Sequence, residues 1–445
     1  MRGSRLVAAL AVAATCGAPA IAAAQVQAQP EAGLTLEQAI ERGLAASHRL
    51  AEIEARRAGA EAVVAGSRAA DRPQASLQAG YTRTNHVDEF GVQVPGQPPR
   101  IIYPDIPDNF RTRIDLQWPI FTFGRTDALE RAARAEVEAA GFDLEAARSD
   151  LKLEITRAFW AVVTAEESVR VVGESLKRMD AALADVRHRL EVGLVPPSDV
   201  LSVEAQRSRQ QLLLVRARNH LDQARADLRR LTGLPPEAPL RALAAFEPPA
   251  PVEADPATLV REAEGARPDR RALAARVAGA GERQEAARAN RRPTVALAGG
   301  VDYARPNPRI FPRMREWNES WDASVQFNWT FWDAGRTKAA VAEASAAGRA
   351  AAERLREFDR LLALEVRQRQ LDLASAAAAI AAANDGVRSA AEARRVVGDR
   401  YASGVATSTE VLDAHVALLQ AELDRTEAIA GARLAEARLA RALGR

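Results

Sequence analysis

Three carboxylates that follow two similar turn sequences are the residues whose chemistry stands out in this chain. The segment LEVGLVPPSDVL (190–201) carries Asp199, and YASGVATSTEVL (401–412) carries Glu410, with Asp413 directly after it. A single carboxylate in such a place is an ordinary solvated acid, or an acid favoured by the dipole at the start of a helix. Copies of the same acid gathered around a symmetry axis would attract cations and raise one another's pKa. The chemistry that these residues offer is therefore electrostatic.

The sequence contains no constellation for catalysis or metal binding. It lacks a P-loop, a GxGxxG that opens a helix, a G-x-S-x-G and an H-E-x-x-H. The five histidines have no ligand spacing; they are His48, His86, His188, His220 and His415. We therefore expect a protein that is not an enzyme and holds neither a metal nor a cofactor.

The N-terminus has the pattern of a secretory signal. A basic start and an apolar run end in Ala22-Ala23-Ala24, which predicts a signal peptide over residues 1–24 that is cleaved before Gln25. The single cysteine, Cys16, lies inside it. Lipidation of Cys16 is the alternative, but the residues before it fit that signal poorly. The mature chain then has no cysteine for disulfides or thiolate metal sites.

The charge of the mature chain is balanced. Without residues 1–24 it carries 59 basic and 59 acidic side chains. No basic surplus indicates nucleic acid as a partner.

The chain repeats itself once. A shift of 211 residues aligns QWPIFTFGR (117–125) with NWTFWDAGR (328–336), and places Gly193 on Gly404. Upstream the shift is 220 and carries Arg72-Pro73 onto Arg292-Pro293, so the first half has nine extra residues before Trp118. Two copies of so large a unit indicate a pseudo-symmetric pair instead of a solenoid of short repeats.

Each half reads as helices, two strands and helices again. The first repeat covers residues 25–233, with strands expected at about 73–85 and 110–121, a long helix at 126–191 and a half-length helix at 198–231. The second covers 257–445, with strands at about 293–304 and 320–332 and helices at 337–402 and 409–443. The proline-rich segment 234–256 between them is a linker or an equatorial belt.

In the strand segments apolar and polar residues alternate. The apolar set of the second strand runs from Phe110 to Trp118, and five of the six tryptophans lie in or beside strands, as lipid-interface girdles require. The polar face suits a water-filled lumen better than a packed core; its residues are Arg111, Arg113, Asp115, Gln117, Asp322, Gln326 and Asn328. A half-buried soluble sheet is the alternative interpretation.

Lipid would force these strands to oligomerise. Four strands cannot close a barrel, and an open edge in lipid leaves backbone groups unpaired. Two chains would give eight strands and three would give twelve, and the polar inner face favours three. The chain would leave the membrane at Trp118 and Trp329, through turns containing Pro119 or Asp333 and bends at Gly124 and Gly335. The membrane interface is expected at Trp118, Pro119, Gly124, Trp329 and Gly335.

The chain resembles the TolC family of outer-membrane efflux ducts (outer membrane factors) over nearly all of its mature length. The motifs, in order, are LTLEQAIERGLAASHRL, RPQASLQAGY, WPIFTFGR and RHRLEVGLVPPSDVLSVEAQ, then RPDRRALAARV, RPTVALAGG, WTFWDAGR and DRYASGVATSTEVLDA. Each motif alone is weak, whereas their order, duplication and spacing are specific.

This resemblance implies a mainly α protein with a membrane β part. A long α-helical coiled-coil barrel would continue into a transmembrane β-barrel, closed only as a homotrimer with 12 strands and 12 helical strands. The duct would cross the Gram-negative outer membrane, extend into the periplasm and serve passively in a tripartite efflux or type I secretion system. Its partners would be outer-membrane lipid, a periplasmic adaptor (membrane fusion protein) and an inner-membrane pump of the RND, ABC or MFS type.

The resemblance also implies roles for the two turns. Adaptor docking falls on Val192, Gly193, Leu194, Gly404 and Val405, and a periplasmic gate on Asp199, Tyr401, Glu410 and Asp413. The chain departs from the family pattern with Glu at 410 and with Ala406 where some members have a basic residue, so a weaker closed-state network is expected. From the residues themselves, Ser198 and Thr409 are expected to cap the helices that follow.

Two rival interpretations come from other classes of protein. One is a soluble periplasmic coiled-coil scaffold, which leaves the polar strand face unexplained. The other is the adaptor itself, which should carry one helical hairpin instead of two. The sequence does not reveal the cargo.

Overall fold

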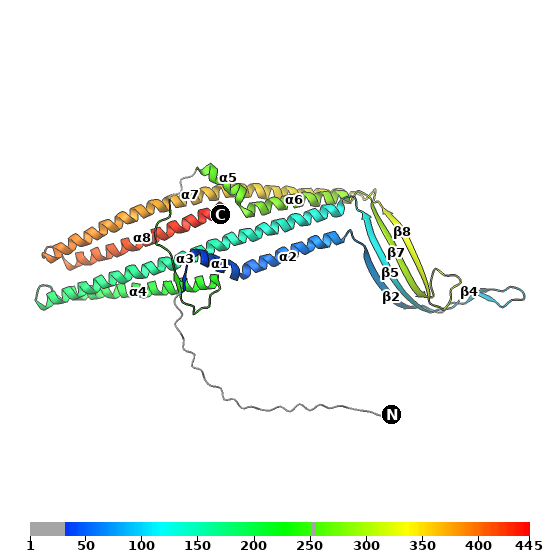
Figure 1. The fold of residues 1–445 in the computed structure, drawn as a ribbon, viewed down its shortest axis with the longest axis horizontal. Coiled ribbons are helices and arrows are strands. Elements are labelled where there is room, and N and C mark those ends of the chain that lie inside the picture. Colours follow the sequence, from blue (N-terminus) through cyan, green and yellow to red (C-terminus); the bar gives the residue numbers. More distant parts are fainter. Residues whose placement is uncertain (1–31, 251–254) are drawn as a thin grey trace, which may run out of the picture.

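The computed structural model describes residues 32–250 and 255–445. The expected signal peptide, Cys16 and residues 251–254 of the expected linker lie outside this part. The described chain is elongated, with a sheet at one end and the turns of two helix pairs at the other (Figure 1).

The described part of the first half, from residue 32 onward, contains four helices and five strands. They are β1 (Ala32–Leu34), α1 (Leu36–Ala46), α2 (His48–Ala69), β2 (Gln74–Arg83), β3 (Phe90–Val92), β4 (Arg100–Tyr103), β5 (Asp108–Phe121), α3 (Arg125–Glu191) and α4 (Pro197–Thr232). The second half contains β6 (Leu240–Ala242), α5 (Pro256–Ala266), α6 (Pro268–Ala289), β7 (Thr294–Arg305), β8 (Asn318–Asn328), α7 (Arg336–Ala402) and α8 (Ser408–Ala442). Three pairs of corresponding helices have equal lengths: α1 and α5 have 11 residues, α2 and α6 have 22, and α3 and α7 have 67. In the fourth pair α4 has 36 residues and α8 has 35.

Two expectations from the sequence need correction. Strand β8 ends at Asn328 instead of 332, because its neighbour β7 begins at Thr294, the partner of Asn328. Pro119 lies inside β5 at a register irregularity and not in a turn. For the segment after α4 the sequence leaves a linker or an equatorial belt open, and in the structure β6 of this segment pairs with β1 in parallel.

The four long strands form one antiparallel sheet in the order β2-β5-β7-β8. Ile114 in β5 stands opposite Leu77 in β2 and Val301 in β7, and Val301 stands opposite Trp321 in β8. These apolar side chains lie on one face and are 53–74% exposed. The outer edges of β2 and β8 have no partner strand within the described residues. The hairpin β3-β4 occupies the region of the extra residues in the first half and extends beyond the sheet (Figure 1).

The helices pack along almost their whole length. A helix of 67 residues is about 100 Å long, so neighbours must cover it. Near the sheet α3 contacts α2 and α6, and farther away it contacts α4 and α8 (Figure 1). The largest core cluster lies at mid-length, where Ile155, Phe159 and Trp160 of α3 meet α1, α4, β1 and β6. In residues 32–250 and 255–445, no helix is both long enough and apolar enough to cross a membrane.

Candidate functional site

An ion-pair network covers the polar face of the sheet. Arg113 Nε donates to Asp115 Oδ1 at 2.6 Å, and its Nη1 contacts Asp302 and lies 2.9 Å from Asp322 Oδ1. Arg111 Nε donates to the other oxygen of Asp302 at 2.6 Å. The Asp302 side chain is only 3% exposed, so two arginines compensate a charge that water hardly reaches. The network ties β5 to β7 and β8.

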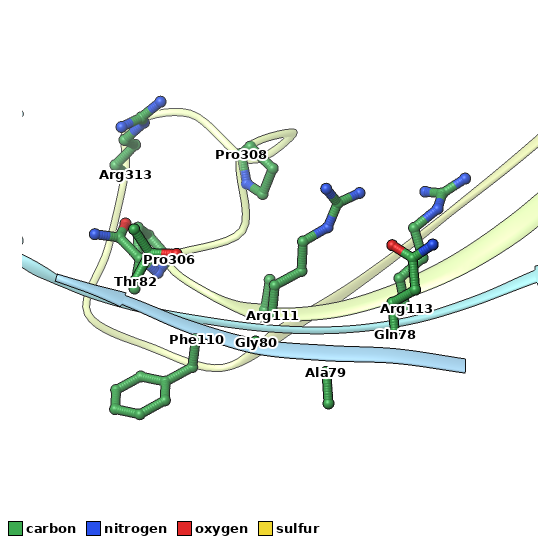
Figure 2. A pocket seen from close by; sticks show the side chains of 12 residues that line it. Gln78, Ala79, Gly80, Thr82, Phe110, Arg111, Arg113, Pro306, Pro308 and Arg313 are labelled. Atoms are coloured by element: carbon green, nitrogen blue, oxygen red, sulfur yellow. The ribbon is translucent and has the colours of Figure 1, made fainter. Parts of the chain in front are cut away.

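The loop between β7 and β8 folds over this network (Figure 2). Arg309 in the loop donates to Trp321 O and to Asp322 Oδ1, both at 2.7 Å. Asn307 Nδ2 donates to Asn318 O at 2.9 Å. A cavity of about 360 Å³ remains between loop and sheet; its polar lining includes Gln78, Thr82, Asn109, Arg111, Arg113 and Arg313. The loop therefore covers part of the polar face of the sheet and adds charged and amide groups to it.

The remaining residues expected on this face are exposed. Gln117, Gln326 and Asn328 lie nearer the helices than the ion pairs do, and their side chains make no hydrogen bond to another described residue. Sequence analysis missed Asp302 and Arg309. The alternation in β7 could have indicated Asp302, but its pairing with Arg113 requires the strand register.

The two passages from strand to helix are near-copies. Trp118 Nε1 donates to Asp71 O, and Trp329 Nε1 donates to Arg291 O, each at 3.0 Å. Gly124 and Gly335 have φ values of 86° and 93°, a left-handed conformation that favours glycine. Each indole is therefore held at the level where the chain turns from strand to helix, as an interfacial tryptophan would be.

At the far end, both helix pairs turn through a left-handed glycine. Gly193 and Gly404 have φ values of 74° and 75°. The next residues donate back across the turn, Leu194 N to Arg189 O at 2.8 Å and Val405 N to Arg400 O at 2.9 Å, which satisfies carbonyls at the helix end. Apolar side chains remain exposed there: Val192 by 56%, Leu194 by 73% and Val405 by 67%.

The expected caps of the following helices were wrong. Thr407, and not Thr409, caps α8; its hydroxyl accepts from Glu410 N while Glu410 Oε1 accepts from Thr407 N, a complete capping box. Helix α4 starts behind Pro196 and has Pro197 at its first position, so Ser198 lies inside the helix. Proline is tolerated there because the first N–H groups of a helix have no internal acceptor.

Tyr401 lies between the two helix pairs. It packs against the apolar cluster of α3 and α4 that contains Met179 and Val203. Its hydroxyl is buried and has no hydrogen-bond partner. Burial raises the pKa of Tyr401; the Arg189 guanidinium opposes this rise, and the Asp199 carboxylate adds to it. The charge of Asp199 thus acts on Tyr401, although no hydrogen bond joins the two side chains.

The other two acids have different surroundings. Hydrogen bonds from the backbone and side chain of Thr407 lower the pKa of Glu410, whose Oε2 lies 4.0 Å from Arg400 Nη1. Asp413 is exposed on α8, and no ion pair joins it to another residue of the described chain. Within one chain these carboxylates do not form a single site.

Comparison with known proteins identifies the fold and the family. The family model described as "Outer membrane efflux protein" matches residues 39–234 and 259–445, which is most of the chain. The chain belongs to this family. The two matched segments fall on the two halves, and the predicted resemblance to outer-membrane efflux ducts is confirmed. The description of the family places this efflux protein in the outer membrane.

Individual relatives are distant in sequence and close in structure. Protein CyaE of Bordetella pertussis (strain Tohama I) is 28% identical over 273 residues, 60% of this chain and 54% of CyaE. The match thus spans little more than half of that relative. The outer-membrane channel OprN is 22% identical with a TM-score of 0.74, covering 92% of this chain and 89% of OprN. The outer membrane protein VceC of Vibrio cholerae is 21% identical with a TM-score of 0.75, covering 92% and 96%.

A buried histidine in the efflux protein escaped the sequence analysis. His415 on α8 is 8% exposed, and burial lowers its pKa to about 4, with Arg394 and Arg178 adding to the effect. The Nε atoms of both arginines are buried without a hydrogen-bond partner. The sequence alone does not distinguish a histidine buried between two packed helices from a histidine on the surface. The reason is that the sequence of one helix does not say which of its sides another helix covers. Among the described residues, no group of histidines or acids is placed to hold a metal ion.

Proposed function

We propose that this efflux protein is the outer-membrane exit duct of a tripartite efflux or type I secretion system and works as a homotrimer. The observation that carries the proposal is the four-stranded sheet with an exposed apolar face, a charged opposite face and two unpaired edges. In lipid such a sheet is stable only when its edges are closed by other copies. Three copies supply twelve strands, enough for a water-filled lumen. A soluble scaffold would leave the exposed strand face without a role.

The polar strand residues would then line the lumen. Arg111, Arg113, Asp115 and Asp322 would form its charged part, and Gln117, Gln326 and Asn328 its amide part. Trp118 and Trp329, with the neighbouring Pro119, Gly124 and Gly335, would mark the interface where the duct leaves the membrane. The indole bonds to Asp71 O and Arg291 O support this placement, since they hold both rings beside the passages.

The turns at the far end would dock onto a periplasmic adaptor that bridges to an inner-membrane pump of the RND, ABC or MFS type. This role is supported by the exposed apolar side chains of Val192, Leu194 and Val405, because exposed apolar patches mark sites of interaction with other proteins. The positive φ of Gly193 and Gly404 shapes the turns that present them.

Asp199, Tyr401, Glu410 and Asp413 would form the periplasmic gate. In a trimer each acid becomes a ring of three at the narrow end, and such rings attract cations. The side chain of Asp413 is the least constrained of the four, because Glu410 also closes the capping box and Tyr401 is partly buried.

The test is conductance of the purified protein in planar bilayers. A trivalent cation added on the side of the turns should block the wild type and block the Asp199→Asn/Asp413→Asn variant at least tenfold more weakly. Asp88→Asn, an exposed acid at the opposite end of the molecule, is the control and should be blocked like the wild type. Conductance that is absent, or a block unchanged in the double variant, would contradict the proposed duct or its gate, respectively.

A further inference from the structure

The joint between the two halves of one chain provides a template for the joint between two chains. We propose that Arg72 of one copy donates to the Ala334 carbonyl of the next copy, and that Gly59 of the first receives Ala346 of the second. The inference rests on the proposed trimer and specifies which surfaces meet in it. Counterparts in the two halves are found with the two internal offsets, which are 211 residues for β5 and α3 and 220 residues for α2 and β2. The first residues of the corresponding helices are separated by the same offsets.

The first observation is a hydrogen bond at the internal joint. Arg292 Nη1, just before β7, donates at 2.8 Å to the carbonyl oxygen of Phe123, just after β5. Phe123 has an unusual positive φ of 50°, and its counterpart Ala334 has a φ of 53°. The two carbonyls are thus presented by the same turn.

At the two open edges of the sheet, the counterparts of this donor and this acceptor have no hydrogen-bond partner among the described residues. Arg72, the counterpart of Arg292, is exposed, and its guanidinium has no hydrogen bond or ion pair to any described residue. The Ala334 carbonyl accepts no hydrogen bond from the described part of the chain. A second copy beside the first would bring these two groups together as Arg292 and Phe123 are brought together.

The second observation is a close approach of helices. At Gly279 on α6 an added Cβ would lie 3.2 Å from Ala135 Cβ on α3. Its counterpart Gly59 on α2 has nothing within 4 Å, and Ala346, the counterpart of Ala135, is exposed on α7. Glycine costs a helix interior roughly 1 kcal/mol relative to alanine, so a second glycine at the matching position indicates a second close contact.

The third observation is the strand register. In the internal joint Trp118 stands opposite Leu297, and Ile114 stands opposite Val301. The same offsets place Trp329 opposite Leu77 and Val325 opposite Tyr81 across the open edges of β8 and β2. These four side chains are 54–69% exposed, and pairing would join them into one apolar band.

The two joints differ in charge. Between α3 and α6, Arg131 Nε lies 2.9 Å from Glu282 Oε2, and Arg276 and Asp143 form a second ion pair. The counterparts of the first pair are Ala342 and Ala62, and those of the second are Arg354 and Arg56. Arg56 is already paired with Glu52 at 2.5 Å. The joint between copies therefore has no counterpart of either ion pair and places two arginines at the second position, so its attraction comes from the small and apolar contacts.

The test is disulfide formation in the full chain embedded in outer membranes. In a Cys16→Ser background, Gly59→Cys with Ala346→Cys should yield covalent dimers and trimers on oxidation, because the template Cβ separation is close to that of a disulfide. Gly279→Cys with Ala135→Cys should link within one chain and leave the monomer mass unchanged. Gly66→Cys with Ala346→Cys, two turns farther along α2, should not link.

The mass of the unoxidised Gly59→Cys/Ala346→Cys protein in detergent shows whether a missing disulfide means that the contact is wrong or that the trimer does not exist. A trimeric Gly59→Cys/Ala346→Cys protein that forms no covalent dimer on oxidation, while Gly279→Cys/Ala135→Cys links within one chain, would overturn the proposed contact and leave the trimeric duct intact. A monomer, in this variant and in the wild type alike, would contradict both the contact and the proposed function. As a second readout, Arg72→Ala should lower the temperature at which the trimer dissociates, and an unchanged temperature would contradict the Arg72–Ala334 hydrogen bond.

Discussion

The guanidinium carbon of Arg189 lies 4.6 Å from the centre of the Tyr401 ring, and Nη1 of Arg189 lies 3.5 Å from the Tyr401 carbonyl oxygen. Arg189 belongs to α3 and Tyr401 to α7, so this contact joins the ends of the two long helices. Arg189 also binds Asp185 at 2.9 Å, which fixes its orientation. Ala406 offers no basic side chain at the second turn, and Arg189 supplies the cation beside Tyr401 instead.

Replacing Arg189 should loosen the closed end of the duct. A cation–π contact at a partly exposed site contributes about 0.5–1 kcal/mol. Arg189→Gln should therefore raise the frequency of open events in planar bilayers by about two- to fivefold. The matched control is Arg187→Gln, because Arg187 pairs with Glu204 inside one helix pair and does not reach α7. Equal opening frequencies for both variants would show that the contact across the pairs does not hold the end closed.

Removing the Tyr401 hydroxyl should not weaken the protein. The hydroxyl is buried without a partner, and such a group costs about 1–3 kcal/mol of stability. Tyr401→Phe retains the ring under Arg189 and should slow amide hydrogen exchange in the neighbouring turns, whereas Tyr401→Ala should accelerate it. Faster exchange in Tyr401→Phe would mean that the hydroxyl has a partner in the assembled protein.

The caps can be distinguished by three single substitutions. Thr407→Ala removes the capping box of α8 and should cost about 1 kcal/mol, seen as faster hydrogen exchange in its first turn. Ser198→Ala and Thr409→Ala should leave exchange in the first turns of α4 and α8 unchanged, because neither side chain caps a helix. A larger effect of Thr409→Ala than of Thr407→Ala would contradict the observed start of α8.

The buried His415 should make the region of the duct around α8 sensitive to acid. The folded pKa of His415, about 4, lies below its ordinary value of 6.5, so unfolding or local opening takes up a proton between these values. Stability is then full above about pH 6.5 and falls as the pH drops towards 4, with a loss of about 2 kcal/mol between pH 7 and pH 5. Hydrogen exchange along α8, corrected for its intrinsic pH dependence, measures this loss.

A substitution of the histidine provides the control. His415→Gln should abolish the pH dependence, and His188→Gln should preserve it, since the His188 side chain is 75% exposed. An acid response that persists in His415→Gln would assign the sensitivity to another group.

Patterns along the chain predicted those parts of the fold that depend on local periodicity. The alternation from Phe110 to Trp118 predicted which strand face is apolar, and the repeated glycines predicted where the helices turn. The start of α8 was misplaced because Thr407, Ser408 and Thr409 are all acceptable caps, and only Glu410 three residues after Thr407 favours the first. That capping box was present in the sequence and was overlooked.

Contacts between distant segments could not be predicted in this way. Arg113 meets Asp302 only through the register of β5 and β7, and Arg189 meets Tyr401 only through the packing of α3 against the helix pair of α7 and α8. Strand register and helix rotation depend on the sum of many weak contacts, which no single residue pattern encodes.

If three copies close one duct in the outer membrane, the intact particle must contain three chains. Its mass can be measured by detergent-corrected light scattering on full-length protein extracted from the outer-membrane fraction of expressing cells. We expect a particle with three chains, recovered from that fraction. A monomer in the soluble periplasmic fraction would contradict it, because strands with two open edges and an exposed apolar face would then exist without lipid or partner.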